Sequence, residues 1–152
     1  MQTEMSESSA GVPGGWLRFG PHLVRVDQDL VCNRIIGVLT LEDMKQMVAI
    51  CTAVVEEYGY VLVLTDNTRA GLPTPEVRKF QIEQLRRPIH PSQAVVYGSS
   101  LISRTSVTMV LRVVELFTGQ KLPITLVADE QSARKILWEA RERFRAQGIA
   151  KR

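Results

Sequence analysis

Hydroxyl, amide and charged side chains gather at two points where a predicted strand gives way to a helix. The first group follows the apolar run 60–65 and consists of Asp66, Asn67, Thr68, Arg69 and Thr74. The second follows the short apolar run 94–97 and consists of Ser99, Ser100 and Arg104. Together with the free N–H groups of a helix N-terminus, such side chains can hold an anion. Thr68 is also a candidate phospho-acceptor, because a phosphate would add about −1.5 to −2 charge and repel an acidic partner surface. These groups are therefore the candidate partner-binding, anion-binding or phospho-acceptor sites.

An alternative explanation for both groups is ordinary turn and capping chemistry, for which Asp, Asn, Ser, Thr and Gly are the usual residues. The loop after Tyr97 is neither a P-loop nor a nucleophile elbow, because it lacks the G-K-[ST] and G-x-S-x-G patterns. His22 and His90 are both expected on turns, and two isolated histidines are too few for a zinc site. We therefore expect no enzyme, no catalytic residue, no metal site and no cofactor.

The elements that must position these groups alternate between strand and helix. Apolar β-branched residues over 16–39 predict two or three antiparallel strands, with a hairpin turn at 27–29. Apolar residues at steps of three and four predict a first helix over 40–58, capped by Thr40 and Asp43 and ended by Gly59. The run 60–65 predicts a strand buried on both faces, and 66–73 a loop.

A second helix is expected from Thr74-Pro75-Glu76 to the prolines Pro88 and Pro91. A strand over 94–97, a third helix ending near Gly119, a strand over 124–128 and a last helix capped by Asp129 complete the order. Strands separated by helices pair in parallel. We therefore predict an α/β fold, a single domain with a mixed, mainly parallel central sheet, opening antiparallel strands and four helices.

Length and composition agree with one ordinary globular domain. The chain has 152 residues, of which 45% are hydrophobic and 23% charged, the balance of a globular domain. We expect a disordered tail over 1–15, the folded domain over 16–147 and a basic C-terminal tail over 148–152. No secretory signal and no apolar run long enough to span a membrane is found, so the chain is expected to be cytoplasmic and not membrane-spanning.

The net charge of +3 is too small to indicate nucleic acid by itself. The stretch 134–152 holds seven Lys or Arg and two Glu, a local charge of +5. Cations at a helix C-terminus explain it well, and an acidic partner or a membrane surface is the alternative. Since few aromatic side chains are available to stack on bases, we expect no nucleic-acid partner.

Three segments carry a resemblance to a known family. They are Ile36-Gly37-Val38-Leu39-Thr40-Leu41-Glu42-Asp43 at the start of the first helix, the buried strand ending at Asp66, and Ile124 to Glu130 leading to Ala133 and Trp138. Over about residues 16–146 the chain resembles the STAS superfamily, the fold of anti-sigma-factor antagonists. It looks most like the SpoIIAA-like branch, which is grouped with lipid-binding SEC14-type domains.

The resemblance implies a small regulatory or interaction domain without catalytic residues. Typical anti-sigma-factor antagonists carry a phosphorylatable Ser in an Asp-Ser-Ser-Gly-Leu loop after the central strand. This chain has Asp66 and Gly71-Leu72 at the corresponding ends, but two residues are inserted and no Ser is present. Thr68 is the only hydroxyl within that loop, which weakens the expectation of a kinase-controlled switch.

Two functions remain open on this basis. The first is a non-enzymatic STAS-like domain that docks a helix face and the two strand-end loops on a protein partner. The second is a SEC14-like domain that binds a small ligand or lipid beside its methionine- and valine-rich first helix, since Met suits adaptable pockets. A sealed core beneath the first two helices favours the first, and an open apolar pocket favours the second. An edge strand of the opening hairpin could also pair with a second copy to form a homodimer.

Overall fold

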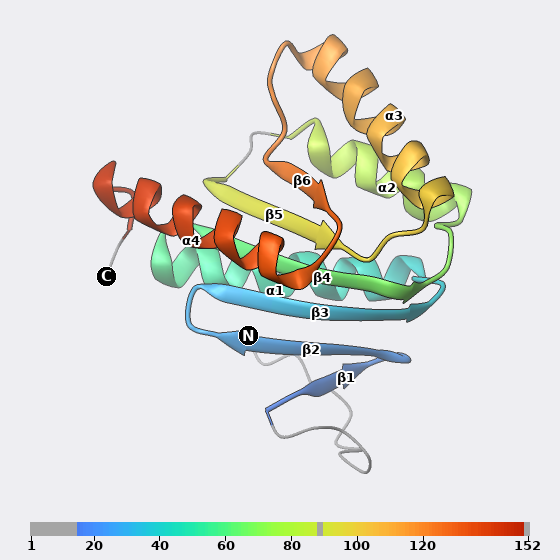
Figure 1. Cartoon of the computed structure of the whole chain (residues 1–152), viewed down its shortest axis with the longest axis horizontal. Helices are drawn as coiled ribbons and strands as arrows, with labels where there is room; N and C mark the ends of the chain where they lie inside the picture. The colour runs from blue at the N-terminus through green and yellow to red at the C-terminus, as the bar shows by residue number, and fades with distance from the viewer. Residues whose placement is uncertain (1–14, 88–89, 151–152) are drawn as a thin grey trace.

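The computed structural model describes residues 15–87 and 90–150 and places them in one six-stranded sheet with four helices (Figure 1). The elements, in chain order, are β1 Leu17–Phe19, β2 His22–Asp27, β3 Leu30–Gly37, α1 Leu41–Tyr58, β4 Val61–Ala70, α2 Pro75–Leu85, β5 Ser92–Tyr97, α3 Leu101–Thr118, β6 Ile124–Val127 and α4 Glu130–Ala146. Within these described residues, the predicted fold class is confirmed. The expected tail over 1–15 lies almost wholly outside them, and the domain boundaries remain predictions.

The strands follow one another across the sheet in the order β1 to β6. β1, β2 and β3 pair antiparallel, and β3, β4, β5 and β6 pair parallel. A helix therefore returns the chain between each pair of parallel strands, as such crossovers require. Because the parallel strands point the same way, their C-terminal ends, with the candidate site residues, share one edge.

The helices divide the sheet into two sides that are packed differently. α4 covers one face, and α1 lies behind the sheet, with α2 and α3 toward its β5–β6 side (Figure 1). α4 packs on β4, β5 and β6, and α1 packs on β3 and β4, whereas α2 packs on α1 and α3 packs on α2. The β5–β6 half of the α1 side is thus covered by helices that rest mainly on other helices.

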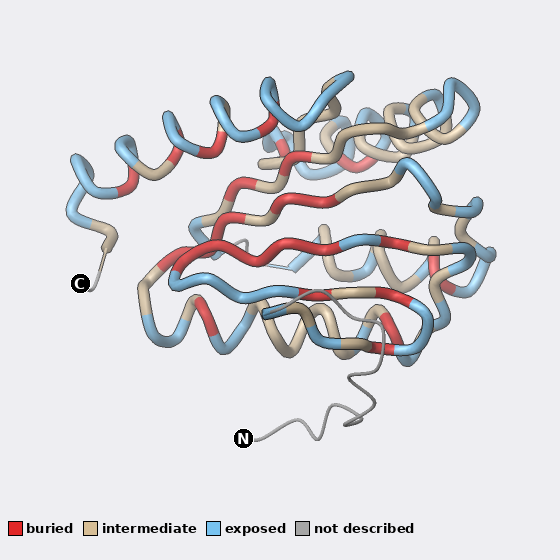
Figure 2. The backbone as a smooth tube through the Cα atoms, turned by 60° about the horizontal axis from the view of Figure 1, so that its bottom comes forward, coloured by how far each residue is buried: buried red, intermediate tan, exposed pale blue. Residues whose placement is uncertain are grey.

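The core reflects this division. Beneath α4, one buried cluster joins Leu62 and Val95 of the sheet to Leu137, Ala140 and Phe144 of the helix. Beneath α1, a second cluster joins strands β1 to β4 to Val54. The most deeply buried segments lie along the central strands and the inner side of α4 (Figure 2). Every residue of β6, by contrast, is only half-buried.

Helix ends follow the expected chemistry. Thr40 accepts from the Asp43 N–H at 3.1 Å while the Asp43 carboxylate accepts from the Thr40 N–H at 3.1 Å, so the predicted reciprocal cap is confirmed. Gly59 ends α1 with φ of 87°, a left-handed conformation that suits glycine. Asp129 caps α4 as predicted, through the Ser132 N–H at 2.8 Å.

The predicted loop over 66–73 is wrong in its first half. β4 continues to Ala70, because its pairing with β3 resumes after an irregularity between Arg34 and Ile36 and joins Ile36 to Arg69. Asp66, Asn67, Thr68 and Arg69 are therefore strand residues. β5 also begins earlier than predicted, at Ser92, and α2 ends at Leu85, ahead of the prolines expected to stop it.

Candidate functional site

The two groups of polar residues do meet at the C-terminal edge of the sheet. Asp66 of β4 stands in register with Tyr97 of β5. Asn67 donates from Nδ2 to Ser99 Oγ at 3.4 Å, which ties the end of β4 to the turn after β5. The structure thus brings together the parts of the sequence that were singled out as candidate sites, although Asp66 to Arg69 approach from a strand.

A glycine makes this close approach feasible. Gly98 has φ of 77°, a left-handed conformation that other residues adopt only under strain. A Cβ atom at Gly98 would overlap the Thr68 Cγ2 and lie 3.2 Å from the Thr68 backbone nitrogen. Glycine is therefore required here both for the backbone conformation and for the space that Thr68 takes.

Thr68, the candidate phospho-acceptor, is exposed, but its hydroxyl is already bonded. Asp66 Oδ1 accepts from both the Thr68 N–H at 2.9 Å and the Thr68 hydroxyl at 2.7 Å. This local bonding is typical of an Asp followed by a turn-forming residue. It holds the end of β4 in place and leaves Thr68 reachable from solvent.

The remaining candidates mainly begin helices. Thr74 Oγ1 accepts from the Val77 N–H at 3.2 Å at the start of α2. Ser100 Oγ accepts from the Ser103 N–H at 3.2 Å at the start of α3, and Arg104 lies in the first turn of that helix. The capping interpretation is thus correct for Thr74 and Ser100. A role in binding an anion or a partner remains a prediction for all eight candidates.

Tyr97 adds a further polar group at this edge that the sequence reasoning missed. Its hydroxyl donates to Glu130 Oε1 at 3.0 Å at the start of α4. Burial, the Glu130 hydrogen bond and the nearby Asp66 charge all raise the pKa of Tyr97. The phenol therefore remains protonated at neutral pH and donates to Glu130, which fits a positioning role.

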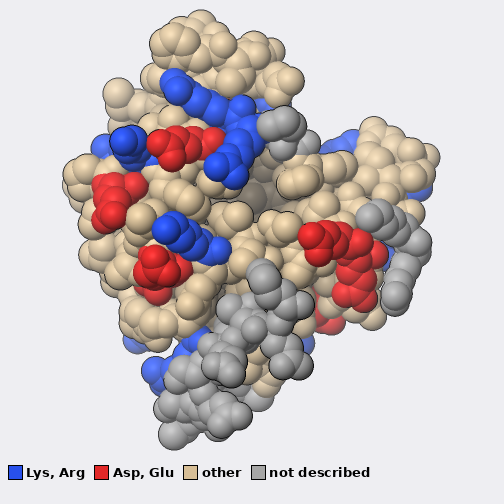
Figure 3. Space-filling model, turned by 180° about the vertical axis from the view of Figure 1, so that it is seen from behind, with Lys and Arg blue, Asp and Glu red and all other residues tan. Residues whose placement is uncertain are grey.

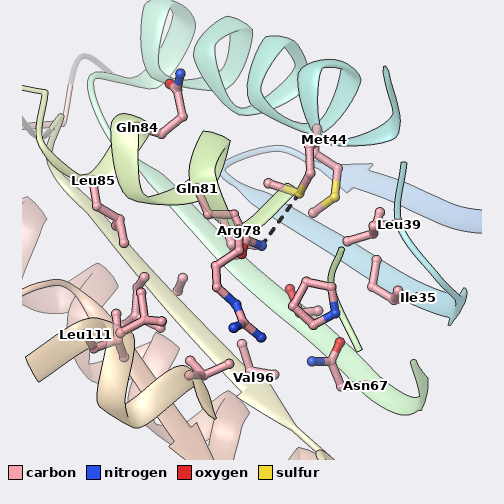
Figure 4. Close-up of a pocket in the computed structure, with 18 of the residues that line it drawn as sticks. Ile35, Leu39, Met44, Asn67, Arg78, Gln81, Gln84, Leu85, Val96 and Leu111 are labelled. Atoms are coloured by element: carbon pink, nitrogen blue, oxygen red, sulfur yellow. Dashed lines mark hydrogen bonds between the residues drawn. The ribbon is translucent and has the colours of Figure 1, made fainter. Parts of the chain in front are cut away.

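A pocket opens between the sheet and the helices α1, α2 and α3 (Figure 4). Its volume is about 320 Å³, within the range of small-ligand pockets, roughly 300–1,000 Å³. Its lining is mostly aliphatic and comes from all three helices and from β3 to β6: Ile35, Leu39, Met44, Met47, Val48, Val63, Pro73, Leu85, Ala94, Val96, Val107, Val110, Leu111, Ile124 and Leu126. By the criterion set from the sequence, this open apolar pocket favours ligand binding.

A few polar side chains interrupt this apolar lining. Arg78 of α2 extends across the pocket toward Asn67 and Val96 (Figure 4). Its Nη2 donates to Ser106 Oγ of α3 at 3.1 Å, and Gln81 contacts the Met44 sulfur at 3.9 Å. Among residues 15–87 and 90–150, no carboxylate lies within ion-pair distance of Arg78.

The pocket continues into a second one of about 420 Å³ toward His90. The two share Met44, Met47 and Ala94 among their lining residues. Cys51 lines the second pocket, where burial raises the pKa of its thiol to about 11. The thiolate is therefore scarce at neutral pH, and Cys51 contributes an apolar surface rather than a nucleophile.

His22 was predicted to lie on a turn, and this is wrong. It is the first residue of β2 and is fully buried. Its Nδ1 accepts from the Ile36 N–H at 2.9 Å, so the ring proton of the neutral form sits on Nε2, which faces Asp43 Oδ2 at 3.1 Å. Burial lowers the pKa of His22, although the Asp43 carboxylate acts in the opposite direction. The imidazole therefore links the opening strands to the cap of α1.

A second buried charged group ties the sheet to α4. Arg141 donates from Nε and Nη2 to the two Asp29 oxygens at 2.8 and 2.6 Å, and the Tyr60 hydroxyl donates to the same carboxylate. Burial alone would raise the pKa of Asp29, but the Arg141 and Tyr60 hydrogen bonds outweigh it and lower that pKa. Like His22 and Asp43, these groups satisfy one another inside the fold.

The outer side of α3 is unusually apolar for a surface helix. It exposes six large hydrophobic side chains, among which Leu116 is 82% exposed and Phe117 74%; the others are Leu101, Ile102, Met109 and Val113. Large exposed apolar side chains grouped on one helix are typical of interaction sites. Seen from behind, the top of the molecule carries no charged side chain, and Lys and Arg side chains gather directly below it (Figure 3).

Two further observations concern metals and membranes. Within the described part of the chain, no group of three or more His, Cys, Asp or Glu side chains is arranged to hold a metal ion. Of the helices in the same residues, none is both long and apolar enough to cross a membrane.

Comparison with known proteins adds one finding on the fold. A solved structure with a similar fold is that of the anti-sigma factor antagonist SpoIIAA in its unphosphorylated form. The two chains are 15% identical, the match covers 75% of this chain and 94% of the other, and the TM-score is 0.45. No family model and no curated protein matches the chain.

Proposed function

We propose that this chain is a non-enzymatic, STAS-like regulatory domain of the cytoplasm that acts through contact with a protein partner. The observation that carries the proposal is the exposed apolar side of α3, which begins directly after the strand-end residues Ser99 and Ser100. A helix side and an adjoining loop edge form one continuous surface. This is the combination of surfaces that the sequence-based hypothesis assigned to docking.

The partner surface is best described as a helix with apolar side chains flanked by carboxylates. A groove of about 340 Å³ runs between α2 and α3 and is lined by Ile82, Met109, Val113 and Phe117. Arg86 lines the same groove, and the stretch 75–118 holds six Lys or Arg against three Glu. Apolar side chains at i and i+4 spacing would fill such a groove. Carboxylates beside them would complement its positive charge.

The absence of catalysis is part of the same proposal. The two buried pairs of charged or titratable groups, His22 with Asp43 and Asp29 with Arg141, hold structural elements together and lie outside the lining of the helix–sheet pocket. The pocket itself is lined chiefly by aliphatic side chains. This distribution supports binding as the mode of action.

Photo-crosslinking tests the protein contact. A photoreactive amino acid replaces Leu116, and a matched chain carries it instead of Leu17, an exposed apolar residue of β1. In cells that express the protein, position 116 is expected to crosslink to an apolar helix flanked by Asp or Glu. Leu116→Glu with Phe117→Glu should remove that partner from pull-downs, and Leu17→Glu should retain it. The proposal would be overturned if position 116 crosslinked to a second copy or to lipid, or if it crosslinked no more than position 17. A measurable enzymatic turnover would overturn it as well.

The open pocket favours a second candidate function, the binding of a small apolar ligand or lipid. α3 contributes to both candidate functions, because Val107, Val110 and Leu111 line the pocket while Leu116 and Phe117 are exposed to a protein partner. Thermal denaturation in the presence of decanol, an uncharged apolar probe, tests this candidate. A saturable rise in the midpoint is expected, and no rise at any concentration would contradict it.

A further inference from the structure

The strongest unassigned feature of the molecule is a half-buried cationic side chain, Arg78, which lines both the apolar pocket and the outer groove between α2 and α3. Arg78 leaves α2 and crosses the pocket above Val96 (Figure 4). A guanidinium group keeps its charge at any pH that a protein survives, and a charge in apolar surroundings is unfavourable unless it is paired. In the described residues it has one neutral partner, the Ser106 hydroxyl.

We infer that the pocket binds an amphipathic anion, with its head group on Arg78 and its apolar body between the sheet and the helices. This inference rests on the second candidate function, ligand binding in the pocket, and assigns the chemistry of its ligand. A guanidinium forms two parallel hydrogen bonds with a carboxylate or a phosphate. The head group is therefore a carboxylate or a phosphate monoester.

Neighbouring polar groups complete the head-group site. Ser106 Oγ lies 3.1 Å from Arg78 Nη2 and can donate its own proton to an anion. Asn67 lines the pocket on the same side as the guanidinium in Figure 4, and its amide can donate as well. One cation and two neutral donors can together bind the oxygens of an anionic head group in an otherwise apolar site.

The apolar body of the ligand would lie against the aliphatic side chains farther inside. Val63, Ala94 and Ile124 stand next to one another on three paired strands, and all three line both pockets. Met44 and Met47 close the same space from α1. Methionine adapts to ligands of different shape, so an unbranched alkyl chain is a suitable probe.

Isothermal titration with three probes of equal chain length tests the inference: decanoate, decyl phosphate and decanol. The wild-type chain is expected to bind at least one of the two anions more tightly than decanol. Arg78→Met keeps the apolar stem, and should weaken anion binding by about tenfold or more, the usual value of charge-assisted hydrogen bonds. It should leave decanol binding unchanged. Arg78→Lys should recover part of the loss.

Arg86→Met is the matched control, since Arg86 ends the same helix and lines the outer groove, as Arg78 also does, but does not line the apolar pocket. It should bind all three probes like the wild type, and far-ultraviolet circular dichroism should show the same helix content for every variant. The head-group inference is overturned if decanol and the anions bind equally tightly, or if Arg78→Met binds the anions as tightly as the wild type. In either case ligand binding in the pocket still holds. Failure of all three probes to bind overturns ligand binding itself.

Discussion

Arg78 Nη2 and Ser106 Oγ, 3.1 Å apart, form a hydrogen bond that joins α2 to α3 across the helix–sheet pocket. The bond matters because these two helices rest mainly on other helices, α2 on α1 and α3 on α2, whereas α4 packs directly on the sheet. One side of the sheet is thus a packed core beneath α4, whereas the other side holds an open apolar pocket lined by residues of β3 to β6.

Filling that space should stabilise the fold. Ala94 of β5 lines the pocket, while the next residue, Val95, points into the sealed core beneath α4. Ala94→Ile is expected to raise the free energy of unfolding by about 0.5–2 kcal/mol, the usual gain from cavity filling. Val95→Leu should lower it by about 1–3 kcal/mol through overpacking. Urea denaturation measures both, and equal destabilisation would show that the Ala94 side is closed as well.

Gly98 should be far less tolerant of a side chain than another glycine with the same backbone. Gly98 and Gly119 have φ of 77° and 69°, but a Cβ atom at Gly119 meets nothing within 4 Å. Gly119→Ala should therefore cost about 1 kcal/mol from backbone strain alone. Gly98→Ala should cost at least 1 kcal/mol more because it collides with Thr68, and adding Thr68→Ser should recover part of the difference. Equal losses in thermal denaturation would contradict the contact.

Stability should fall in mild acid because of His22. Its pKa is lowered in the folded state, so below about pH 6.5, the usual histidine value, the unfolded chain binds more protons than the folded one. The stabilisation present above that pH is then lost as the pH drops toward the folded-state pKa. Protonation would also place a hydrogen on Nδ1 against the Ile36 N–H.

The midpoint of thermal unfolding between pH 5 and pH 8 checks this prediction. His22→Gln should be less stable at pH 8 and less dependent on pH, because the titrating ring is gone. His90→Gln should follow the wild-type curve, since His90 is exposed. If the unfolding midpoint of His22→Gln depends on pH as strongly as that of the wild type, His22 is not the cause.

The Asp29–Arg141 pair should be worth far more than an ion pair on the surface. Side-chain exposures are 4% for Asp29 and 17% for Arg141, against 49% and 46% for Glu130 and Arg134. Arg141→Met leaves a buried carboxylate without its cation and should cost about 3 kcal/mol. Arg134→Met should change stability by less than about 1 kcal/mol. Denaturant unfolding measures both losses, and an equal decrease in the free energy of unfolding of the two variants would contradict this ranking.

Much of the fold could be predicted from local signals. The helix starting at Thr40 and its end at Gly59 follow from side-chain hydrogen bonds within a few residues, and such chemistry is visible in any single sequence. The extension of β4 through Asp66 to Ala70 was not visible. It depends on pairing with β3, across an irregularity that no local pattern indicates.

The candidate site was predictable only in part for the same reason. Strand-end residues such as Asn67 and Ser99 could be placed together because parallel strands end at one edge. His22 was misplaced, since its burial depends on Asp43, 21 positions away in the sequence. The sequence left open whether a pocket exists beneath the helices, because the volume of the pocket depends on how far α2 and α3 stand from the sheet.

The main claim for the helix–sheet pocket is that it binds an anion with an apolar body. The most direct measurement is a titration of the methyl-labelled protein with decanoate, followed by nuclear magnetic resonance. Saturable shifts are expected at Val63, Val107 and Leu126, with contacts from the decanoate chain to those methyl groups. Leu137, on the buried side of α4, should be unchanged. Shifts confined to the α4 side, or none at any of these methyl groups, would contradict it.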